Sequence, residues 1–396
     1  MRLRALLTLH ACVAVLACEK KVESPAPAPA PAAPQAPTAA APSAKDVILL
    51  GEIGSLTGAQ ATFGVSTKQG VEMAVSEANA SGGIKGRKVA VQVYDDQGKP
   101  EEAANAATRL IAQDHVAVIL GEVASTNSLA MAPKAQSAHV PMISPSSTNP
   151  KVTEVGDYIF RVCFIDPFQG FVMAKFAHEN LKVSKAAVLK DQKSDYSQGL
   201  TDVFTRKFTE MGGTIVGVEA YAQGDTDFRA QLTAIKKAKP DAIYIPGYYT
   251  DVGIIARQAS ELGLKATLLG GDGWESDKLF ELGGKAVEGS YYTNHYSPED
   301  PAPQVQQFIA SYKKMFGAVP DSLAALGYDA ARVAMDGMKR ASEPTGASLR
   351  DALAQTKDFP GAAGTISLDG ARNAVKPAVV LQVQGGKTKF VTTISP

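Results

Sequence analysis

Three cysteines are all that this 396-residue chain contains, and neither sign of charge is in excess. Lysine and arginine together number 40, as do aspartate and glutamate, so the formal net charge is zero. A neutral chain without a clustered basic face argues against a nucleic acid as partner. Beyond residue 46 no apolar run is long enough to cross a bilayer. These absences exclude a disulfide-rich scaffold, a membrane-spanning bundle and a nucleic-acid-binding protein as working hypotheses.

The first 45 residues predict export and attachment to a membrane. Residues 1–17 hold two arginines and a short apolar core, which is typical of a secretory signal peptide. The small Ala17 before Cys18 resembles a bacterial lipobox, which would make Cys18 the lipidated first residue of the mature protein, although Leu16 is bulkier than usual there. Ordinary cleavage beside a chance cysteine is the alternative. Residues 18–45 are rich in proline and alanine without an apolar period, which predicts a disordered tether.

The remaining chain, about 350 residues, exceeds the usual size of one hydrophobic core, so two domains are expected. Apolar strands alternate with amphipathic helices. The first strand is expected at 47–53, and the helix that follows carries Val71, Ala74, Val75 and Ala78 on one face. Regular β-α alternation predicts an α/β fold whose parallel sheets are covered by helices on both faces.

Two halves of the chain repeat the same order of signals. Each has a Gly-Gly helix stop, a strand ending near tyrosine and aspartate, a helix, and an apolar strand that ends in glycine. That last glycine is Gly121 in the first half and Gly247 in the second, so Tyr248 and Tyr249 would take the place that Val123 to Ser125 take in the first half. Two facing strand-end loops predict a ligand cleft between two like lobes.

Residues 116–150 carry the clearest sign of a binding site. Two apolar runs, 116–120 and 140–143, each open into a loop rich in hydroxyl side chains. Ligands of open α/β sheets bind outside the carboxyl ends of the strands, and backbone N–H groups at a helix start suit a carboxylate. The loops therefore predict a small-molecule site, and helix or turn capping is the alternative for any single hydroxyl. The hydroxyl-bearing residues are Ser125, Thr126, Ser144, Ser146, Ser147 and Thr148.

Motifs of catalysis and of cofactor binding are missing from the sequence. The glycines after the first strand are spaced too widely for a dinucleotide turn, and neither a phosphate loop nor a GxSxG nucleophile elbow occurs. The histidines of the mature chain are scattered, so no metal site is expected. Asp95 and Asp96 are adjacent carboxylates, but they end a strand and are assigned a structural role. We expect no enzyme and no cofactor, and no intrachain disulfide because Cys163 is alone once Cys18 is lipidated and Cys12 is removed.

Seven short motifs, each weak alone, occur in an order that identifies a family. The chain resembles, from about residue 46 to its end, the leucine/isoleucine/valine-binding proteins, which are substrate-binding components of branched-chain amino acid ABC transporters. The motifs are IGSLTGAQATFG (53–64), NASGGIKGRKVAVQVYDD (79–96), GEVAST (121–126), ISPSSTNP (143–150), DYSQG (195–199), PGYYTDVG (246–253) and GGDGW (270–274).

This resemblance implies a type I periplasmic-binding fold. Such a fold has two Rossmann-like lobes with parallel sheets, joined by a three-segment hinge. Lobe one would comprise residues 46–165 and 296–375, and lobe two residues 166–295 and 376–396. A ligand would close the two lobes around itself by a hinge motion.

The resemblance also implies how lobe one binds an amino acid. The hydroxyls of Ser125 and Thr148 would hold the α-carboxylate, with help from backbone N–H groups. The backbone carbonyl of Ser146 and the hydroxyl of Thr148 would receive the α-ammonium. A zwitterion needs donors at one end and negative charge or acceptors at the other, which these groups supply in part.

From lobe two, the hydroxyls of Tyr196 and Tyr248 would close on the ligand. Asp272 would face the ammonium at a position where many family members have glutamate, so its shorter side chain reaches less far. Trp274 would border the pocket for the ligand side chain, and a place in the core is its alternative. The residues implied for that pocket are Phe63, Val123, Ala124 and Trp274, whose apolar character suits an aliphatic or aromatic ligand side chain.

Two functions follow from the resemblance. The first is an extracytoplasmic solute-binding lipoprotein of the periplasm or cell surface, a monomer that delivers a branched-chain or other apolar amino acid to the permease of an ABC importer. The second is a ligand-sensing receptor of the same fold that binds a different small carboxylate or amide. An enzyme of the cell envelope would need a nucleophile or a metal set, and the sequence offers neither.

Overall fold

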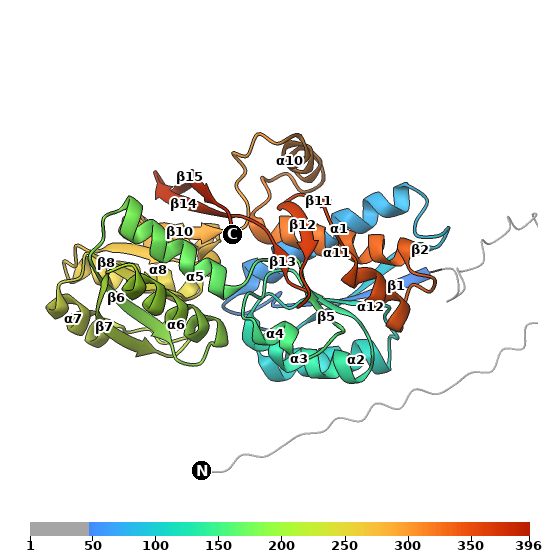
Figure 1. Cartoon of the computed structure of the whole chain (residues 1–396), viewed down its shortest axis with the longest axis horizontal. Helices are drawn as coiled ribbons and strands as arrows, with labels where there is room; N and C mark the ends of the chain where they lie inside the picture. The colour runs from blue at the N-terminus through green and yellow to red at the C-terminus, as the bar shows by residue number, and fades with distance from the viewer. Residues whose placement is uncertain (1–46) are drawn as a thin grey trace, which may run out of the picture. The chain divides into compact units, whose positions relative to one another are not determined.

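The computed structural model describes residues 47–396, which form two large sheets and a small third one. Figure 1 shows the large sheets side by side, each with helices on both faces. No helix in residues 47–396 is both long and apolar enough to span a membrane. The predicted signal peptide (1–17) and the predicted lipidated tether (18–45) lie outside the described residues.

The first sheet has five parallel strands in the order β2-β1-β3-β4-β5. Helices α1 and α11 cover one face of it, and α2 and α3 cover the other. Strand β1 lies inside the sheet, which explains why most of its residues are apolar and buried. The strands are β1 (Val47–Gly54), β2 (Lys88–Asp95), β3 (Ile119–Leu120), β4 (Met142–Ser144) and β5 (Ile159–Arg161).

Two glycines bring α1 and α11 into close contact. A Cβ atom at Gly70 would collide with the backbone of Ala324, and one at Gly327 would collide with the backbone of Thr67. The absence of side chains at these two positions therefore lets the helix backbones approach each other. The helices of this half are α1 (Ala61–Ala80), α2 (Pro100–Ala112), α3 (Ser125–Ser137), α4 (Lys151–Glu154), α10 (Pro303–Phe316), α11 (Ser322–Arg340) and α12 (Gly346–Ala354).

The second sheet has seven strands in the order β15-β14-β10-β9-β8-β6-β7. Strands β6 to β10 run parallel, whereas β14 and β15 are antiparallel to their neighbours. Helices α5 and α6 pack on one face, and α7 and α8 pack on the other. The strands are β6 (Lys185–Asp191), β7 (Thr214–Tyr221), β8 (Ala242–Ile245), β9 (Thr267–Gly270), β10 (Tyr291–Asn294), β14 (Ala378–Gln384) and β15 (Lys387–Ile394).

Short helical turns complete the second half, and a small antiparallel sheet precedes β14. The helices are α5 (Asp166–Lys175), α6 (Asp195–Glu210), α7 (Arg229–Ala238), α8 (Tyr249–Glu261) and α9 (Asp277–Gly283), with the π-helix η1 (Phe176–Asn180) and the 3-10 helices η2 (Asp272–Trp274) and η3 (Gly284–Val287). The small sheet holds β11 (Phe359–Gly361), β12 (Gly364–Leu368) and β13 (Ala374–Val375).

The chain passes three times between the two large sheets. It crosses from β5 to α5, from β10 to α10, and from β13 to β14. The predicted α/β class with two Rossmann-like lobes is confirmed. The prediction that both sheets are parallel is corrected for the second sheet, because β14 and β15 make it mixed. The residue bounds predicted for the lobes stay a prediction, since strand pairing alone does not define a rigid body.

Candidate functional site

A small hollow lies where loops from the two sheets meet. The free volume of the hollow is about 10 Å³, roughly the room that one water molecule needs, so the surrounding side chains nearly fill the space. It is lined by residues that follow β3, β4, β8 and β9 together with residues from the starts of three helices. The lining residues are Phe63, Val123, Ser146, Tyr196, Tyr248, Asp272, Gly273 and Leu323.

Strands β3 and β4 deliver the hydroxyl-rich wall of this hollow. Ser146 and Thr148 are buried, and neither hydroxyl has a hydrogen bond of good geometry among residues 47–396. Thr148 lies near the carboxyl group of Asp166. Ser125 begins α3, and its Oγ accepts a hydrogen bond of 3.2 Å from the backbone N–H of Asn149. Buried hydroxyls without partners are costly, so this wall is suited to receive a polar ligand.

Hydrogen bonds within the first lobe hold the same two loops in place. The carbonyl oxygen of Glu122 accepts from the hydroxyls of Ser128, Ser144 and Ser147 at 2.8–3.0 Å. Arg161, which is fully buried, donates to the backbone carbonyl of Ser147 and to other carbonyls of the second loop. The backbone of this wall is therefore fixed before any ligand arrives.

Two buried carboxyl groups lie behind this wall and serve structure rather than binding. Glu122 Oε1 accepts from the backbone N–H and the hydroxyl of Ser55, at 3.0 and 3.1 Å. Asp96 accepts from Ser55 and from Asn127, each at 2.9 Å. Burial and the nearby Asp96 carboxylate raise the pKa of Glu122 well above its usual value. The structural role predicted for Asp95 and Asp96 agrees with these contacts.

The opposite wall carries Asp272, which begins η2 just after β9. Its Oδ1 accepts from Gln169 Nε2 at 2.7 Å and from the hydroxyl of Tyr196 at 2.9 Å. Its Oδ2 lies 2.9 Å from His295 Nε2. The carboxylate is therefore held by groups from α5, α6 and the end of β10. Sequence reasoning missed Gln169 and His295, although His295 follows a strand end, the same signal that located Ser146.

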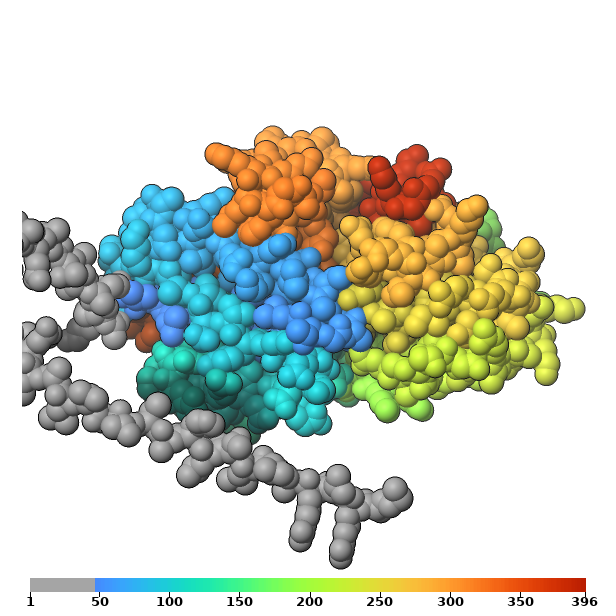
Figure 2. All heavy atoms as spheres, turned by 180° about the vertical axis from the view of Figure 1, so that it is seen from behind, coloured from blue at the N-terminus to red at the C-terminus, as the bar shows by residue number. Residues whose placement is uncertain are grey.

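Aromatic side chains connect the two walls. Tyr196 and Tyr248 stack with ring centroids 5.2 Å apart, and Phe63 of α1 meets Tyr248 edge to face at 5.8 Å. The hydroxyl of Thr250 donates to the carbonyl of Ala59, and Figure 2 shows the start of α1, in blue, against the yellow segments of the second lobe. These contacts close an apolar cover over the hollow.

Polar contacts add to this closure on both sides of the hollow. Thr126 donates to Asp195 Oδ2 at 3.0 Å, and Asn149 donates to the backbone carbonyl of Asp195 at 2.8 Å. The backbone N–H of Ser322, at the start of α11, donates to Glu275 Oε1 at 3.2 Å. Burial, with the nearby Asp321 carboxylate, raises the pKa of Glu275 to about 7. The two lobes are therefore in direct contact around the hollow.

Not every residue predicted for the site lines the hollow. Trp274 is fully buried in the second lobe, where its Nε1–H donates to the carbonyl of Ile245 at 2.9 Å and its ring tilts against Tyr292. The prediction that it borders the ligand pocket is corrected: it is a core residue. Ala124, Ser125 and Thr148 are buried and are not lining residues, whereas Leu323, which the sequence did not indicate, is one.

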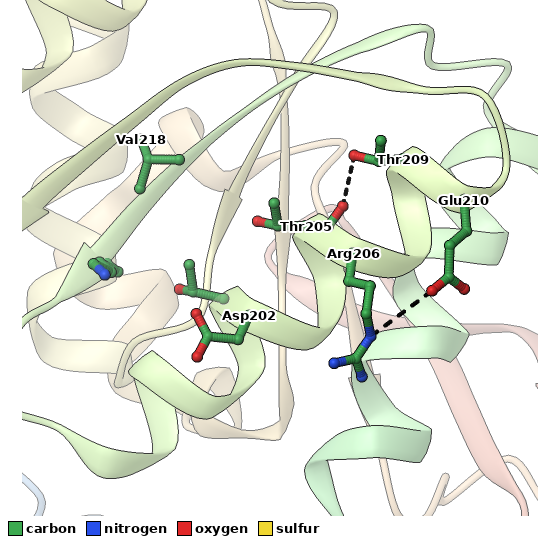
Figure 3. A pocket seen from close by; sticks show the side chains of 8 residues that line it. Asp202, Thr205, Arg206, Thr209, Glu210 and Val218 are labelled. Carbon is green, nitrogen blue, oxygen red and sulfur yellow. Dashed lines mark hydrogen bonds and ion pairs between the residues drawn. The ribbon is translucent and has the colours of Figure 1, made fainter.

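A second hollow lies on the outside of α6 (Figure 3). The figure shows Asp202, Arg206 and Glu210 along the helix, with Arg206 3.9 Å from Glu210. Both side chains of this pair are more than half exposed, so this hollow is an open surface. Within residues 47–396 no group of three or more His, Cys, Asp or Glu side chains is arranged to hold a metal ion.

Comparison with known proteins identifies the family to which this chain belongs. The family model described as periplasmic binding protein matches residues 47–388. The Leu/Ile/Val-binding protein homolog 3 of Brucella melitensis is 32% identical over 81% of this chain and 86% of its own length. This chain belongs to the periplasmic binding protein family, and the suspected kinship with Leu/Ile/Val-binding proteins is confirmed.

Solved structures agree with that assignment. The leucine-binding protein LivK of Thermotoga maritima is 41% identical, covers 88% of this chain and 99% of its own, and superimposes with a TM-score of 0.85. LivJ of Streptococcus pneumoniae, solved with isoleucine, is 32% identical over 88% of this chain and all of its own, with a TM-score of 0.84. A solute-binding protein of Rhodopseudomonas palustris, solved with 3,4-dihydroxybenzoic acid, is 27% identical over 88% and 98%, with a TM-score of 0.78.

Proposed function

We propose that this protein captures an apolar α-amino acid, a branched-chain one above all, in the hollow between its lobes and delivers it to an ABC importer. One observation carries the proposal. A carboxylate, Asp272, and a buried hydroxyl without a good partner, that of Ser146, line the same small hollow, and the similarly unpartnered hydroxyl of Thr148 lies two residues further along the same loop. The remaining lining is largely aromatic and aliphatic. The chemistry of this lining suits a small zwitterion with an apolar side chain.

The two ends of the zwitterion find different partners. The ammonium faces Asp272, with the carbonyl of Ser146 and the hydroxyl of Thr148 as further acceptors. The carboxylate receives the hydroxyls of Ser125 and Thr148 and backbone N–H groups near the start of α3. Each hydrogen bond to a charged group contributes about 1.5–3 kcal/mol. A handful of them, less the cost of ordering, gives micromolar binding, or about −8 kcal/mol.

The ligand side chain lies against Phe63, Val123, Tyr248 and Leu323. These four side chains offer no charge, so aspartate, glutamate, lysine and arginine as ligands would leave a buried charge without a partner. The isoleucine bound to the LivJ relative supports the aliphatic assignment. The absence of a catalytic constellation in the sequence supports a binding role rather than an enzymatic one.

Delivery to a transporter defines where the protein works. Secretion through the signal peptide at 1–17, lipidation of Cys18 and the tether at 18–45 would hold a monomeric binding domain close to the permease, in the periplasm or on the cell surface. Replacing Cys18 with serine tests this arrangement, because the variant should leave the membrane fraction. Continued membrane association would remove the lipid anchor from the proposal.

A second candidate is a receptor of the same fold that senses a small carboxylate. The dihydroxybenzoic acid bound to the Rhodopseudomonas palustris relative favours it. A thermal-shift screen of the purified protein against the 20 common amino acids and aromatic and aliphatic carboxylates separates the two, since a ligand that binds only the folded state raises the melting temperature. A rise with leucine, isoleucine or valine supports the proposal. A rise with carboxylates alone supports the second candidate.

A further inference from the structure

We propose that His295 is a positioning residue for Asp272 and that its protonation competes with the ammonium group of the ligand, so that affinity for amino acids falls in acid. This inference rests on the proposed function and adds to it a dependence of binding on pH. It concerns a residue that does not line the hollow. The argument starts from the contacts of the Asp272 carboxylate.

Asp272 is fixed from behind by three side chains. Gln169 and Tyr196 donate to Oδ1, at 2.7 and 2.9 Å, and His295 Nε2 lies 2.9 Å from Oδ2. Gln169 Nε2 also lies 2.9 Å from the hydroxyl of Thr293 on β10. The Asp272 side chain is 10% exposed and the His295 side chain 1%. Only a small part of the Asp272 carboxylate is therefore exposed, and this part lines the hollow.

His295 itself has little freedom to move away from Asp272. Its ring stacks on Phe164 with centroids 3.8 Å apart and planes at 26°. Its backbone N–H donates to the side chain of Asn294 at 2.8 Å. The ring can therefore donate through Nε2 to Asp272, while Nδ1 is buried without a partner among residues 47–396. A neutral imidazole with its proton on Nε2 satisfies this arrangement.

Charged groups around His295 set its balance between the neutral and the protonated ring. Burial lowers the pKa of His295, the Asp272 contact opposes this shift, and the nearby Lys376 adds to it. Burial also lowers the pKa of Lys376, to about 8. Of the neighbouring acids, Asp166 has its pKa raised by burial to about 8 and Cys163 to about 12, so both are neutral in acid. Asp272 is then the carboxyl group that a protonated His295 would face.

Protonation of His295 would give Asp272 a counter-charge before the ligand arrives. The ammonium would then meet a neutral ion pair instead of a net negative charge. Linkage makes the effect reciprocal: if a proton on His295 weakens ammonium binding, ammonium binding must release that proton. Affinity falls as the pH drops through the pKa of His295, by at most tenfold per pH unit. A ligand without an ammonium group would not show this loss.

Isothermal titration of leucine at pH 5.0–7.5 tests the inference in the wild-type protein and in His295→Gln. The glutamine amide can still donate to Asp272 but does not titrate. We expect the wild-type Kd to rise at least threefold more than the variant Kd between pH 7.5 and pH 5.0. Other titrating groups, such as Asp166 and Glu275, are present in both proteins and cancel in this ratio. The exposed His115→Gln serves as the matched control and should follow the wild type.

A second measurement guards against a variant that folds poorly. Titrating the wild-type protein at pH 5.5 in two buffers of different ionisation enthalpy counts the protons released on leucine binding. A larger release of protons at pH 5.5 than at pH 7.5 supports the inference, and the absence of proton release at pH 5.5 overturns it. Parallel pH profiles for a folded His295→Gln variant and the wild type also overturn it. If leucine and the other amino acids fail to bind at pH 7.5, the proposed function itself fails.

Discussion

The two walls of the hollow are built in different ways. The first-lobe wall consists of two loops whose hydroxyls and backbone are fixed largely by neighbours in the same half of the chain, such as Glu122, Ser144 and Ser147. The second-lobe wall carries one carboxylate, Asp272, which is held by side chains from α5, α6 and the end of β10. One wall offers hydroxyls and backbone groups, and the other wall offers negative charge.

Under the proposed function, this difference would orient a bound amino acid. Its carboxylate belongs at the first-lobe wall, because Asp272 repels it from the second. Its ammonium must reach both walls, because its counter-charge comes from the second lobe and further acceptors come from the first. A zwitterion therefore stabilises the contact between the lobes in a way that neither charged end achieves alone. The predictions below test the two walls separately.

Removing hydroxyls from the first-lobe wall should have the largest effect. Ser125→Ala combined with Thr148→Ala removes two donors to the ligand carboxylate, so leucine binding should weaken by more than a hundredfold in a calorimetric titration. The melting temperature of the ligand-free protein should fall only modestly, because Thr148 loses no hydrogen bond of good geometry and Ser125 loses one, which its Oγ accepts from the backbone N–H of Asn149 at 3.2 Å. A joint collapse of binding and stability would instead favour the capping role of these hydroxyls. Ser137→Ala, at the far end of α3, is the control.

Neutralising the second-lobe wall should weaken binding by tenfold or more. Asp272→Asn keeps the shape of the side chain but leaves the ligand ammonium without a counter-charge. The Kd for leucine, measured by calorimetry, should rise accordingly, while the exposed Asp277→Asn should leave it unchanged. An unaltered Kd in Asp272→Asn would remove this residue from the site.

A carboxyl group beneath the two walls should make stability depend on pH. Burial raises the pKa of Asp166 to about 8, from a value near 3.8 in the unfolded chain. Between these values the folded state binds a proton that the unfolded state does not, so stability is highest in acid and falls as the pH rises towards 8. Asp166→Asn removes this loss.

Relative to wild type, Asp166→Asn should raise the melting temperature by about 2–4 °C more at pH 8.5 than at pH 5.5. A difference of roughly 1 kcal/mol in the free energy of unfolding would produce this shift. The exposed Asp202→Asn is the matched control and should shift both temperatures equally. An Asp166→Asn variant whose gain is the same at both pH values would contradict the assigned shift.

The smallest effect on binding is expected from Trp274. Because this side chain fills the core of the second lobe, Trp274→Phe should lower the unfolding free energy by roughly 1–3 kcal/mol and change the Kd for leucine less than twofold. Denaturant unfolding and calorimetry measure the two quantities. A large loss of affinity without loss of stability would return Trp274 to the ligand pocket.

The sequence could indicate the hydroxyl-rich loops of the first-lobe wall because the information for them is local. Ser146 and Thr148 follow an apolar strand within a few residues, and the rule for strand ends is enough to find them. Gln169 and His295 approach Asp272 from positions 103 and 23 residues away, and only the folded chain brings them together. His295 does follow the end of β10, but neither local sequence indicates that the side chain reaches Asp272.

Two further differences have similar causes. The position of Trp274 two residues after Asp272 suggested that it borders the pocket, but a residue at this distance can turn towards either the ligand or the core. Trp274 donates to the carbonyl of Ile245 and is buried in the core. The alternation of strands and helices predicted parallel sheets, yet β14 and β15 form a hairpin after the last crossing, and β14 pairs antiparallel to β10. Strand direction depends on that crossing, which the strand residues do not encode.

Comparing leucine with two truncated analogues tests the central claim most directly. 4-Methylpentanoic acid lacks the ammonium, and 3-methylbutylamine lacks the carboxylate, while both keep the apolar side chain. Calorimetric titration at pH 7.5 should give micromolar binding for leucine and at least hundredfold weaker binding for each analogue, since each engages one set of polar partners. Equal affinity for the acid and for leucine would contradict the pairing of an ammonium with Asp272.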